Sequence, residues 1–284
     1  MGKLRLALGP GGAAPGEISA LGQGTWLMAE GQRDPKDEEA ALALGIDLGM
    51  NLIDTAEMYG SGTSEALVGR VIKSRGDAVF LVSKVYPHNA SRTGAPAACA
   101  RSLKRLGVER IDLYLLHWRG AIPLAETVAA FEKLKVEGKI GAWGVSNFGT
   151  ADMLELASVP GGKNCAANQV LYHPDSRGIE FDLLPYCAGQ NIAVMAYSPL
   201  GHSGGPLRSP ALAEVAKRHG ATPAQIAIAW GMRHPHVISI PKSGDVAHVR
   251  DNARAANIAL TAADLAVIDA AHQPPQRKQL LDML

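Results

Sequence analysis

Short apolar runs recur along the chain and alternate with stretches whose apolar residues follow a helical period. The clearest run is residues 111–118, Ile-Asp-Leu-Tyr-Leu-Leu-His-Trp, which ends on the titratable side chain of His117. An apolar run of this length, with β-branched and aromatic residues, is typical of a strand covered on both faces. The same pattern predicts eight strands, at residues 18–26, 51–54, 79–84, 111–118, 140–146, 166–170, 192–198 and 237–241.

Helical segments with recognisable ends lie between these strands. Thr222 and Pro223 combine an N-cap hydroxyl with a proline at the first helical position. Gly49 and Gly107 follow the last periodic residue of their segments, as C-cap glycines do. Ten helices are predicted, at residues 35–49, 65–73, 96–106, 124–137, 151–157, 181–189, 210–219, 223–234, 247–256 and 261–271.

The strict alternation of strands and helices predicts a parallel sheet with crossover helices. Eight such units in 284 residues match the (β/α)8 TIM barrel, an α/β fold for which roughly 250 residues is typical. A doubly wound sheet would need a glycine-rich phosphate loop after its first strand, and the nearest candidate, residues 60–65, lacks the third glycine. We predict a single domain over residues 1–284, with an N-terminal hairpin or turn at 1–17, two helices beyond the barrel's eight, and a short C-terminal tail at 273–284.

Composition and charge restrict the partners of the chain. The 28 basic and 27 acidic residues nearly cancel, and no basic stripe favours a nucleic-acid or membrane surface. No apolar run approaches the ~20 residues that span a bilayer. Cys99, Cys165 and Cys187 match no metal or redox spacing, which predicts free thiols in a reducing, cytoplasmic compartment. His234 and His236 lack nearby partners with ligand spacing, so we expect no metal site.

Polar side chains recur where the predicted strands end, which is where a barrel of this type carries its chemistry. From the second strand to the eighth, these residues are Asp54 with Tyr59 in the following loop, Lys84, His117, Ser146 with Asn147, Gln169, Tyr197 with Ser198, and Lys242 with Ser243. Each has a plain structural interpretation, since Asp54 and Lys84 could form a buried ion pair and His117 could be a hydrogen-bonded core histidine. Their repetition on seven consecutive strands outweighs these interpretations, because a scaffold has no reason to repeat the feature.

Four of these residues together suit one kind of chemistry. A phenol has a reference pKa of about 10, and a nearby ammonium lowers it, so we expect Lys84 to lower the pKa of Tyr59. Asp54 would hold the ammonium, and His117 would orient a carbonyl oxygen. The set therefore suits proton donation to a developing alkoxide. Reduction of a carbonyl also needs a hydride, which no side chain supplies, so a nicotinamide cofactor is implied.

Eight short motifs lie in order along the chain. They are Gly24-Thr25-Trp26, Asp54-Thr55-Ala56-Glu57-Met58-Tyr59-Gly60, Val82-Ser83-Lys84, Leu113-Tyr114-Leu115-Leu116-His117-Trp118, Gly144-Val145-Ser146-Asn147-Phe148, Asn168-Gln169-Val170-Leu171-Tyr172-His173-Pro174, Tyr197-Ser198-Pro199-Leu200-Gly201 and Ile240-Pro241-Lys242-Ser243. With them the chain resembles an aldo-keto reductase of the bacterial type along nearly its whole length. The resemblance implies a monomer that reduces small aldehydes, dicarbonyls or keto sugars to alcohols, with NADPH as the preferred cofactor and NADH as the alternative.

The resemblance also implies roles for the residues at the strand ends. It implies a catalytic tetrad of Asp54, Tyr59, Lys84 and His117, with Tyr59 as the general acid. The residues that it implies for the cofactor are Gly24, Thr25, Asp54, Ser146, Asn147, Gln169, Tyr197, Ser198, Leu200, Lys242, Ser243, His248 and Asn252. Those that it implies for the substrate pocket are Trp26, Tyr59, His117 and Trp118.

Short loops are expected around this pocket. The loop after His117 covers only residues 119–123, the stretch after Ser198 is short and glycine-rich, and about a dozen residues, 273–284, follow the last helix. In the family that the chain resembles, these three loops shape the pocket. We therefore expect an open, shallow pocket with broad activity on small carbonyls and weak affinity.

Two other functions fit parts of the pattern. A lysine at a strand end also suits a Schiff-base aldolase or lyase, but this function leaves Tyr59, His117 and Gln169 unexplained. A redox-sensing subunit that binds the cofactor and regulates a partner would not need all four groups of the tetrad.

His248 stands four residues before Asn252, where the family's pattern has an arginine. Arginine holds a phosphate through a charged planar fork, and a neutral histidine does less. We expect His248→Arg to lower the Michaelis constant for NADPH in steady-state kinetics, because it restores a phosphate-binding cation. An unchanged or higher constant would contradict the placement of residue 248 at the phosphate.

Overall fold

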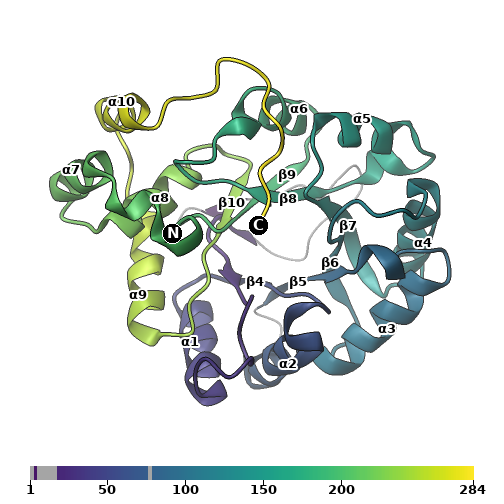
Figure 1. Ribbon diagram of the computed structural model, residues 1–284. Coiled ribbons are helices and arrows are strands. Elements are labelled where there is room, and N and C mark those ends of the chain that lie inside the picture. The colour runs from purple at the N-terminus through teal and green to yellow at the C-terminus, as the bar shows by residue number, and fades with distance from the viewer. Residues whose placement is uncertain (1–2, 5–17, 76–78) are drawn as a thin grey trace.

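The computed structural model describes residues 3–4, 18–75 and 79–284, and its strands form a parallel barrel (Figure 1). The barrel strands are β3 (Gln23–Gly24), β4 (Leu52–Asp54), β5 (Phe80–Val85), β6 (Ile111–Leu116), β7 (Ile140–Ser146), β8 (Ala167–Leu171), β9 (Ala193–Tyr197) and β10 (Val237–Ile240). Each pairs with its neighbour in chain order, and bridges from Leu21 to Ser239 and from Gly24 to Lys242 join the first strand to the last. The predicted (β/α)8 barrel is confirmed.

The prediction of one strand over residues 18–26 is wrong. Its first part, β2 (Ile18–Ser19), pairs antiparallel with β1 (Lys3–Leu4), whereas β3 pairs parallel with β4 inside the barrel. The break follows from pairing, because the two halves of the segment have different partner strands. Most of the hairpin predicted for residues 1–17 lies outside the described residues, and the antiparallel pair of β1 and β2 is the part of it that can be seen.

Helices surround the barrel (Figure 1). They are α1 (Pro35–Asp47), α2 (Thr63–Arg75), α3 (Gly94–Leu106), α4 (Leu124–Val136), α5 (Thr150–Ser158), α6 (Leu183–Gly189), α7 (Pro210–His219), α8 (Pro223–Gly231), α9 (Val246–Arg254) and α10 (Ala262–Ala271). The predicted end signals act as expected: the side chain of Thr222 accepts from the Gln225 N–H, and Gly107 ends α3 with a φ of 68°. Two helices follow β9, and α10 follows α9, so the chain carries two helices beyond the eight of the barrel.

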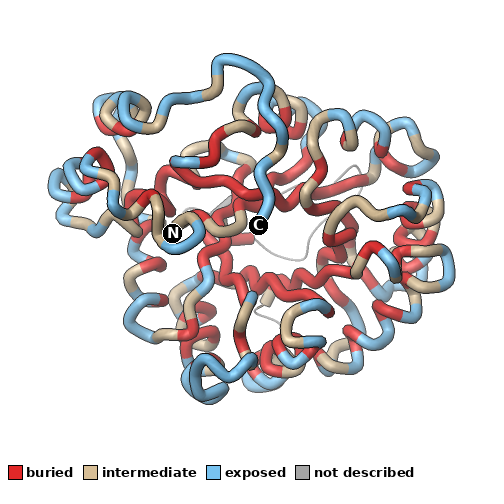
Figure 2. Tube along the Cα trace, viewed as in Figure 1, coloured by how far each residue is buried: buried red, intermediate tan, exposed pale blue. Residues whose placement is uncertain are grey.

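Side chains of the barrel strands alternate between the interior and the helical layer. Val82, Leu113 and Leu115 belong to the cluster that fills the barrel, whereas Tyr114 and Leu116 pack among the residues between strands and helices. Figure 2 shows the strands as the continuous buried part of the molecule. Lys84 lies two residues beyond Val82, and His117 lies two residues beyond Leu115. Both therefore belong to the inward-facing set. The strand period therefore directs both polar side chains into the mouth of the barrel.

The segment after α10 crosses this mouth and ends near its centre (Figure 1). Lys278 Nζ lies 3.3 Å from Asp182 Oδ2, and the Ser176 hydroxyl donates to Asp282 Oδ2 at 2.7 Å. These contacts fasten the tail to the loop after β8, and its last residues, Met283 and Leu284, line the pocket described below. No helix of the described residues is long and apolar enough to cross a membrane.

Close packing of α2 on α3 gives a test of the fold. A Cβ on Gly69 would lie 2.6 Å from the carbonyl oxygen of Leu106 and 2.8 Å from that of Arg105, and backbone atoms cannot move aside cheaply. We expect Gly69→Ala to lower the free energy of unfolding by about 1–3 kcal/mol in urea denaturation. The matched control is Gly189→Ala at the exposed end of α6, where a Cβ meets nothing within 4 Å. This control should be neutral or stabilise by about 0.5 kcal/mol, and equal effects of the two substitutions would contradict the packing described.

Candidate active site

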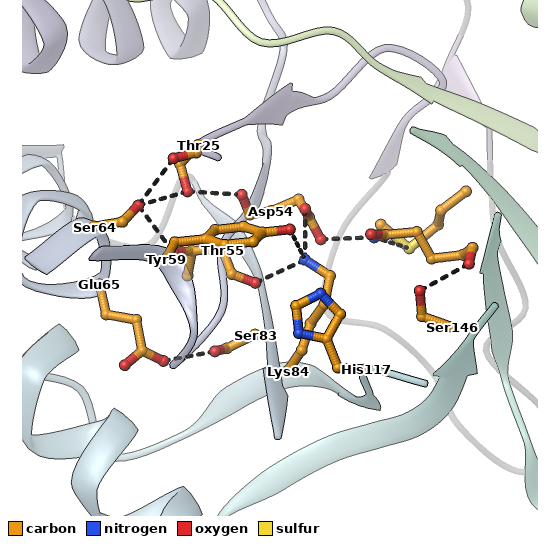
Figure 3. Close-up of polar contacts among 12 residues, drawn as sticks. Thr25, Asp54, Thr55, Tyr59, Ser64, Glu65, Ser83, Lys84, His117 and Ser146 are labelled. Carbon is orange, nitrogen blue, oxygen red and sulfur yellow. Dashed lines mark hydrogen bonds and ion pairs between the residues drawn. The ribbon is translucent and has the colours of Figure 1, made fainter. Parts of the chain in front are cut away.

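The ammonium of Lys84 lies at the centre of the barrel mouth, and its side chain is fully buried. Nζ donates to Asp54 Oδ2 at 2.7 Å, to the Thr55 carbonyl oxygen at 2.9 Å and to the Tyr59 phenolic oxygen at 3.0 Å (Figure 3). An ammonium has three N–H donors, so these three acceptors satisfy it completely. Burial lowers the pKa of Lys84, but the charge of Asp54 and the Tyr59 oxygen raise it more, so the group stays protonated.

A tight turn after β4 brings Tyr59 to this ammonium. Tyr59 begins a 3-10 turn, Tyr59–Gly62, in which Gly60 and Gly62 have φ values of 55° and 94°. Glycine adopts these left-handed values at little cost, which lets the chain reverse within four residues. The Tyr59 ring then lies edge-on to the His117 imidazole, with 5.8 Å between ring centroids. The turn therefore presents the phenol between the ammonium of Lys84 and the imidazole.

The structure does not bear out the expected direction of the Tyr59 pKa shift. Burial raises the pKa of Tyr59, the Lys84 ammonium lowers it, and the carboxylate of Asp54 raises it again, with a net rise. The neighbouring ammonium can be inferred from the sequence, whereas the desolvation of a phenolate in an enclosed site cannot. At neutral pH Tyr59 is therefore a protonated phenol, which is the form that can give up a proton.

His117 is neutral in this environment. Burial, with the charge of Lys84 as the lesser cause, lowers the pKa of His117 to about 2. Its Nδ1 is buried and has no hydrogen-bond partner among the described residues. A neutral imidazole can donate one hydrogen bond and accept another, so it can orient a polar group without adding charge.

A layer of buried polar groups lies beside the tetrad, and of its outer members only Thr25 was predicted as a site residue. The Ser64 hydroxyl donates toward Thr25 Oγ1 at 2.8 Å, and the Thr25 hydroxyl donates to the Asp54 carbonyl oxygen at 3.0 Å (Figure 3). Farther below, the carboxylate of Glu65 accepts from the Ser83 hydroxyl and from Arg105, each at 2.6 Å. These bonds join the start of α2 to the loop after β3, to β5 and to α3, and they join that loop to β4. No spacing in the sequence could have identified the Glu65–Arg105 pair, because its members lie on different helices.

Amide and hydroxyl groups line the opposite side of the mouth. Gln169 Nε2 donates to Asp54 Oδ1 at 2.7 Å, so both carboxylate oxygens of Asp54 are engaged. The Asn147 amide donates to the His117 carbonyl oxygen and to Ser146 Oγ, each at 3.2 Å, and its oxygen accepts from the Tyr197 hydroxyl at 3.0 Å. Asn147 has a φ of 60°, a value that asparagine tolerates better than most residues. The structure thus brings together the predicted residues at the ends of β7, β8 and β9.

A pocket of about 270 Å³ opens above these groups. Its lining residues are Trp26, Met58, Tyr59, His117, Trp118, Ser146, Asn147, Gln169, Tyr197, Met283 and Leu284. Eight of them were predicted from the sequence, and Met58, Met283 and Leu284 were not. Met58 precedes Tyr59 and could have been suspected from that position, whereas nothing in the sequence of the tail marked its last two residues.

The other predicted cofactor residues lie away from this pocket. Ser198 and Leu200 follow β9, whereas Lys242, Ser243, His248 and Asn252 follow β10 or lie on α9. Lys242 and His248 are exposed, and Asn252 is buried. Gly24 and Thr25 lie at the rim beside β4 and β10, with the Thr25 side chain buried in the network around Ser64. The polar residues of the rim therefore divide into an enclosed group around Lys84 and a more open group around Lys242.

Known proteins of one family match this chain. The profile of the "Aldo/keto reductase family" matches residues 20–273. The chain is 50% identical to "Methylglyoxal reductase YeaE" of Escherichia coli over 275 residues, which cover 95% of this chain and 97% of the relative. It is 35% identical to "Glyoxal reductase" of Bacillus subtilis, with 89% of each chain covered. An aldo-keto reductase from Klebsiella pneumoniae, solved in complex with NADPH, is 48% identical, with all of both chains covered and a TM-score of 0.95.

The buried environment of His117 predicts how its imidazole titrates. Since its pKa is lowered to about 2, the ring should stay neutral from about pH 5 to about pH 9, whereas an unperturbed histidine takes up a proton near pH 6.5. Nitrogen NMR of protein labelled at histidine should show no inflection for His117 in this range. A His117→Gln variant identifies the signal. A midpoint near 6.5 for that signal would contradict the burial described.

Proposed function

This chain belongs to the aldo/keto reductase family, and we propose that it reduces small aldehydes, dicarbonyls or keto sugars to alcohols with NADPH, with Tyr59 as the proton donor. The observation that supports this most is the position of the Lys84 ammonium. It lies 3.0 Å from the Tyr59 phenolic oxygen and 2.7 Å from the carboxylate of Asp54, beneath a pocket of small-molecule size.

Proton transfer in this site follows from the contacts of Tyr59. A carbonyl oxygen in the pocket would lie against the Tyr59 hydroxyl and the neutral His117 ring, both of which line it. As negative charge develops on that oxygen, Tyr59 gives it a proton and becomes a phenolate. Lys84 already donates to the same phenolic oxygen, so it stabilises the phenolate without any rearrangement. Asp54 fixes the ammonium in place through this step.

The groups around the pocket fit a nicotinamide cofactor. The reduced cofactor supplies the hydride that no side chain can supply. The amides of Asn147 and Gln169 and the hydroxyl of Ser146 line the pocket, and such groups complement a carboxamide. The Tyr197 ring lines the same pocket and offers a surface for a flat heterocycle. Lys242 and Ser243, with Ser198, Leu200 and Asn252 on the same side of the rim, would hold the phosphates and the adenine.

The size and lining of the pocket favour small carbonyl substrates. Its volume is about 270 Å³, and the rings of Trp26 and Trp118 with Met58 and the tail residues Met283 and Leu284 give it apolar walls. The relatives named above include a methylglyoxal reductase and a glyoxal reductase, which supports short dicarbonyls as substrates. Met283 and Leu284 of the tail add walls to the pocket that were not expected from the short loops. The rate of reduction should therefore depend on the chain length of the substrate.

The Schiff-base alternative has little structural support. A lysine that attacks a carbonyl must be an accessible, uncharged amine. Lys84 is fully buried, its three donors are engaged, and its pKa is raised by the charge of Asp54. A regulatory subunit without turnover is also disfavoured, because the complete tetrad is arranged for catalysis.

We also propose that the enzyme is a cytoplasmic monomer. Its three cysteines, Cys99, Cys165 and Cys187, are buried, and burial raises the pKa of each thiol to about 12. Protonated thiols in a core suit a reducing compartment. The monomer follows from the family resemblance, and size-exclusion chromatography with light scattering would test it.

Tyr59→Phe tests the assignment of the proton donor. We expect the rate of methylglyoxal reduction with NADPH to fall by about 10²–10⁴-fold, because the variant has no proton to give. Binding of NADPH, measured by fluorescence, should be unchanged. Tyr186→Phe is the matched control, since it removes a phenol hydroxyl on α6 that makes only a 3.5 Å contact with the Met153 carbonyl oxygen.

The same assay, run over a panel of carbonyls with NADPH and with NADH, tests the substrate class. Short aldehydes and dicarbonyls should turn over readily with weak saturation. Full activity of Tyr59→Phe would contradict the mechanism. Saturation by a steroid ketone at low concentration, together with poor turnover of short aldehydes, would contradict the substrate class.

A further inference from the structure

The exposed end of the proposed cofactor site needs positive side chains to hold a phosphate. Lys242 and Ser243 follow β10, and His248 stands on the first turns of α9, where it is exposed to solvent. An imidazole lacks the planar fork of N–H donors with which a guanidinium binds two phosphate oxygens at once. Within residues 242–248, Lys242 is the one lysine or arginine that could bind the extra phosphate of NADPH.

A second permanent cation reaches this segment from a distant part of the chain. Arg33 lies in the loop between β3 and α1, and its Nη1 is 3.3 Å from Asp245 Oδ2. Its Cδ lies 3.2 Å from the point where a side chain on Gly244 would begin. Arg33 therefore lies directly over the turn between Ser243 and α9. Burial lowers the pKa of Lys242, the carboxylates of Glu38 and Glu30 raise it, and the positive charge of Arg33 lowers it, with a net lowering.

The absence of a side chain at residue 244 allows this arrangement. A Cβ there would lie 2.9 Å from Glu38 Cγ as well as close to Arg33. The Glu38 carboxylate is buried and accepts from the Ala29 N–H at 2.7 Å, which fixes the start of the loop that carries Arg33. The start of the loop is thus held by a contact that does not involve Asp245.

The pair between Arg33 and Asp245 leaves the guanidinium free to bind more. The two side chains are 45% and 31% exposed, and ion pairs this exposed contribute little to stability. Asp245 Oδ1 already accepts from the N–H groups of Ala247 and His248, so the carboxylate has a separate task at the start of α9. Arg33 has five N–H donors and uses one of them here. The remaining fork suits bidentate binding of a phosphate.

We propose that Arg33 binds the 2′-phosphate of NADPH opposite Lys242, and so fills the role of the arginine that is missing at position 248. This inference rests on the proposed function, because it concerns the same cofactor site. It makes the loop between β3 and α1, rather than α9, the element that distinguishes NADPH from NADH. A solely structural role for Arg33, as the ion-pair partner of Asp245, is the alternative that the experiment must separate.

Arg33→Gln tests the proposal through cofactor affinity rather than turnover. Titration of the purified protein with NADPH and with NADH, followed by quenching of tryptophan fluorescence, gives the two Kd values. The Kd for NADPH should rise at least tenfold, and that for NADH should stay within twofold. Added salt should weaken NADPH binding less in the variant than in the unaltered protein. Arg250→Gln, which removes the same charge from the exposed side of α9, should leave both constants nearly unchanged.

A second substitution decides whether the two positions serve the same phosphate. Adding His248→Arg to Arg33→Gln should restore most of the lost affinity for NADPH. An unchanged NADPH constant in Arg33→Gln, an equal loss for both cofactors, or no recovery with His248→Arg would overturn the proposal. These results differ from a failure of the proposed function, in which the unaltered protein would bind neither cofactor.

Discussion

The active site depends on one buried charge, the ammonium of Lys84. An ion enclosed by protein costs several kcal/mol unless acceptors replace the water it has lost. Asp54, the Thr55 carbonyl oxygen and the Tyr59 phenolic oxygen are those acceptors, and Lys84 has no further donor to offer. Because each acceptor is needed, none of them can move far without exposing an unpaired charge. The position of the proposed proton donor, Tyr59, is therefore fixed by the same bonds that stabilise the ammonium inside the barrel.

Alternation along the strands explains why so much of this could be predicted from the sequence. Inward-facing residues follow a period of two, so the apolar positions that fill the barrel also identify the polar positions at its mouth. Val82 faces the interior, so Lys84, two residues later, faces it too. Leu113 and Leu115 indicate in the same way that His117 faces inward. Apolar runs and end signals predicted the barrel, and the residues at the strand ends predicted most of the pocket. The first strand was predicted wrongly because its halves pair with different strands, which a linear pattern cannot reveal.

What could not be predicted depends on contacts across long sequence distances or on the extent of burial. The pKa of Tyr59 is raised because burial outweighs the nearby ammonium, and burial is known only once the chain is folded. The tail lines the pocket because Lys278 and Asp282 find partners near residue 180, about a hundred positions earlier. Arg33 and Asp245 meet only because the barrel closes and brings its first and last strands together. None of these facts leaves a local pattern in the sequence.

The two parts of the rim differ in how well they tolerate substitution of their residues. The groups around Lys84 stand on strands or on the turn after β4 and enclose its ammonium, so removing one partner leaves an uncompensated charge and costs about 3–5 kcal/mol. The groups that would recognise the cofactor's phosphate and the body of the substrate stand on the loop of Arg33, on α9 and on the tail, where contacts are exposed. Exposed ion pairs contribute about 1 kcal/mol or less, so they can be exchanged without endangering the fold. A histidine at position 248 can therefore coexist with an intact tetrad, and on the proposal above Arg33 of the neighbouring loop would supply the missing cation. In this barrel the proposed proton donor is held by buried contacts, whereas the residues proposed to select the cofactor and the substrate lie at more exposed positions.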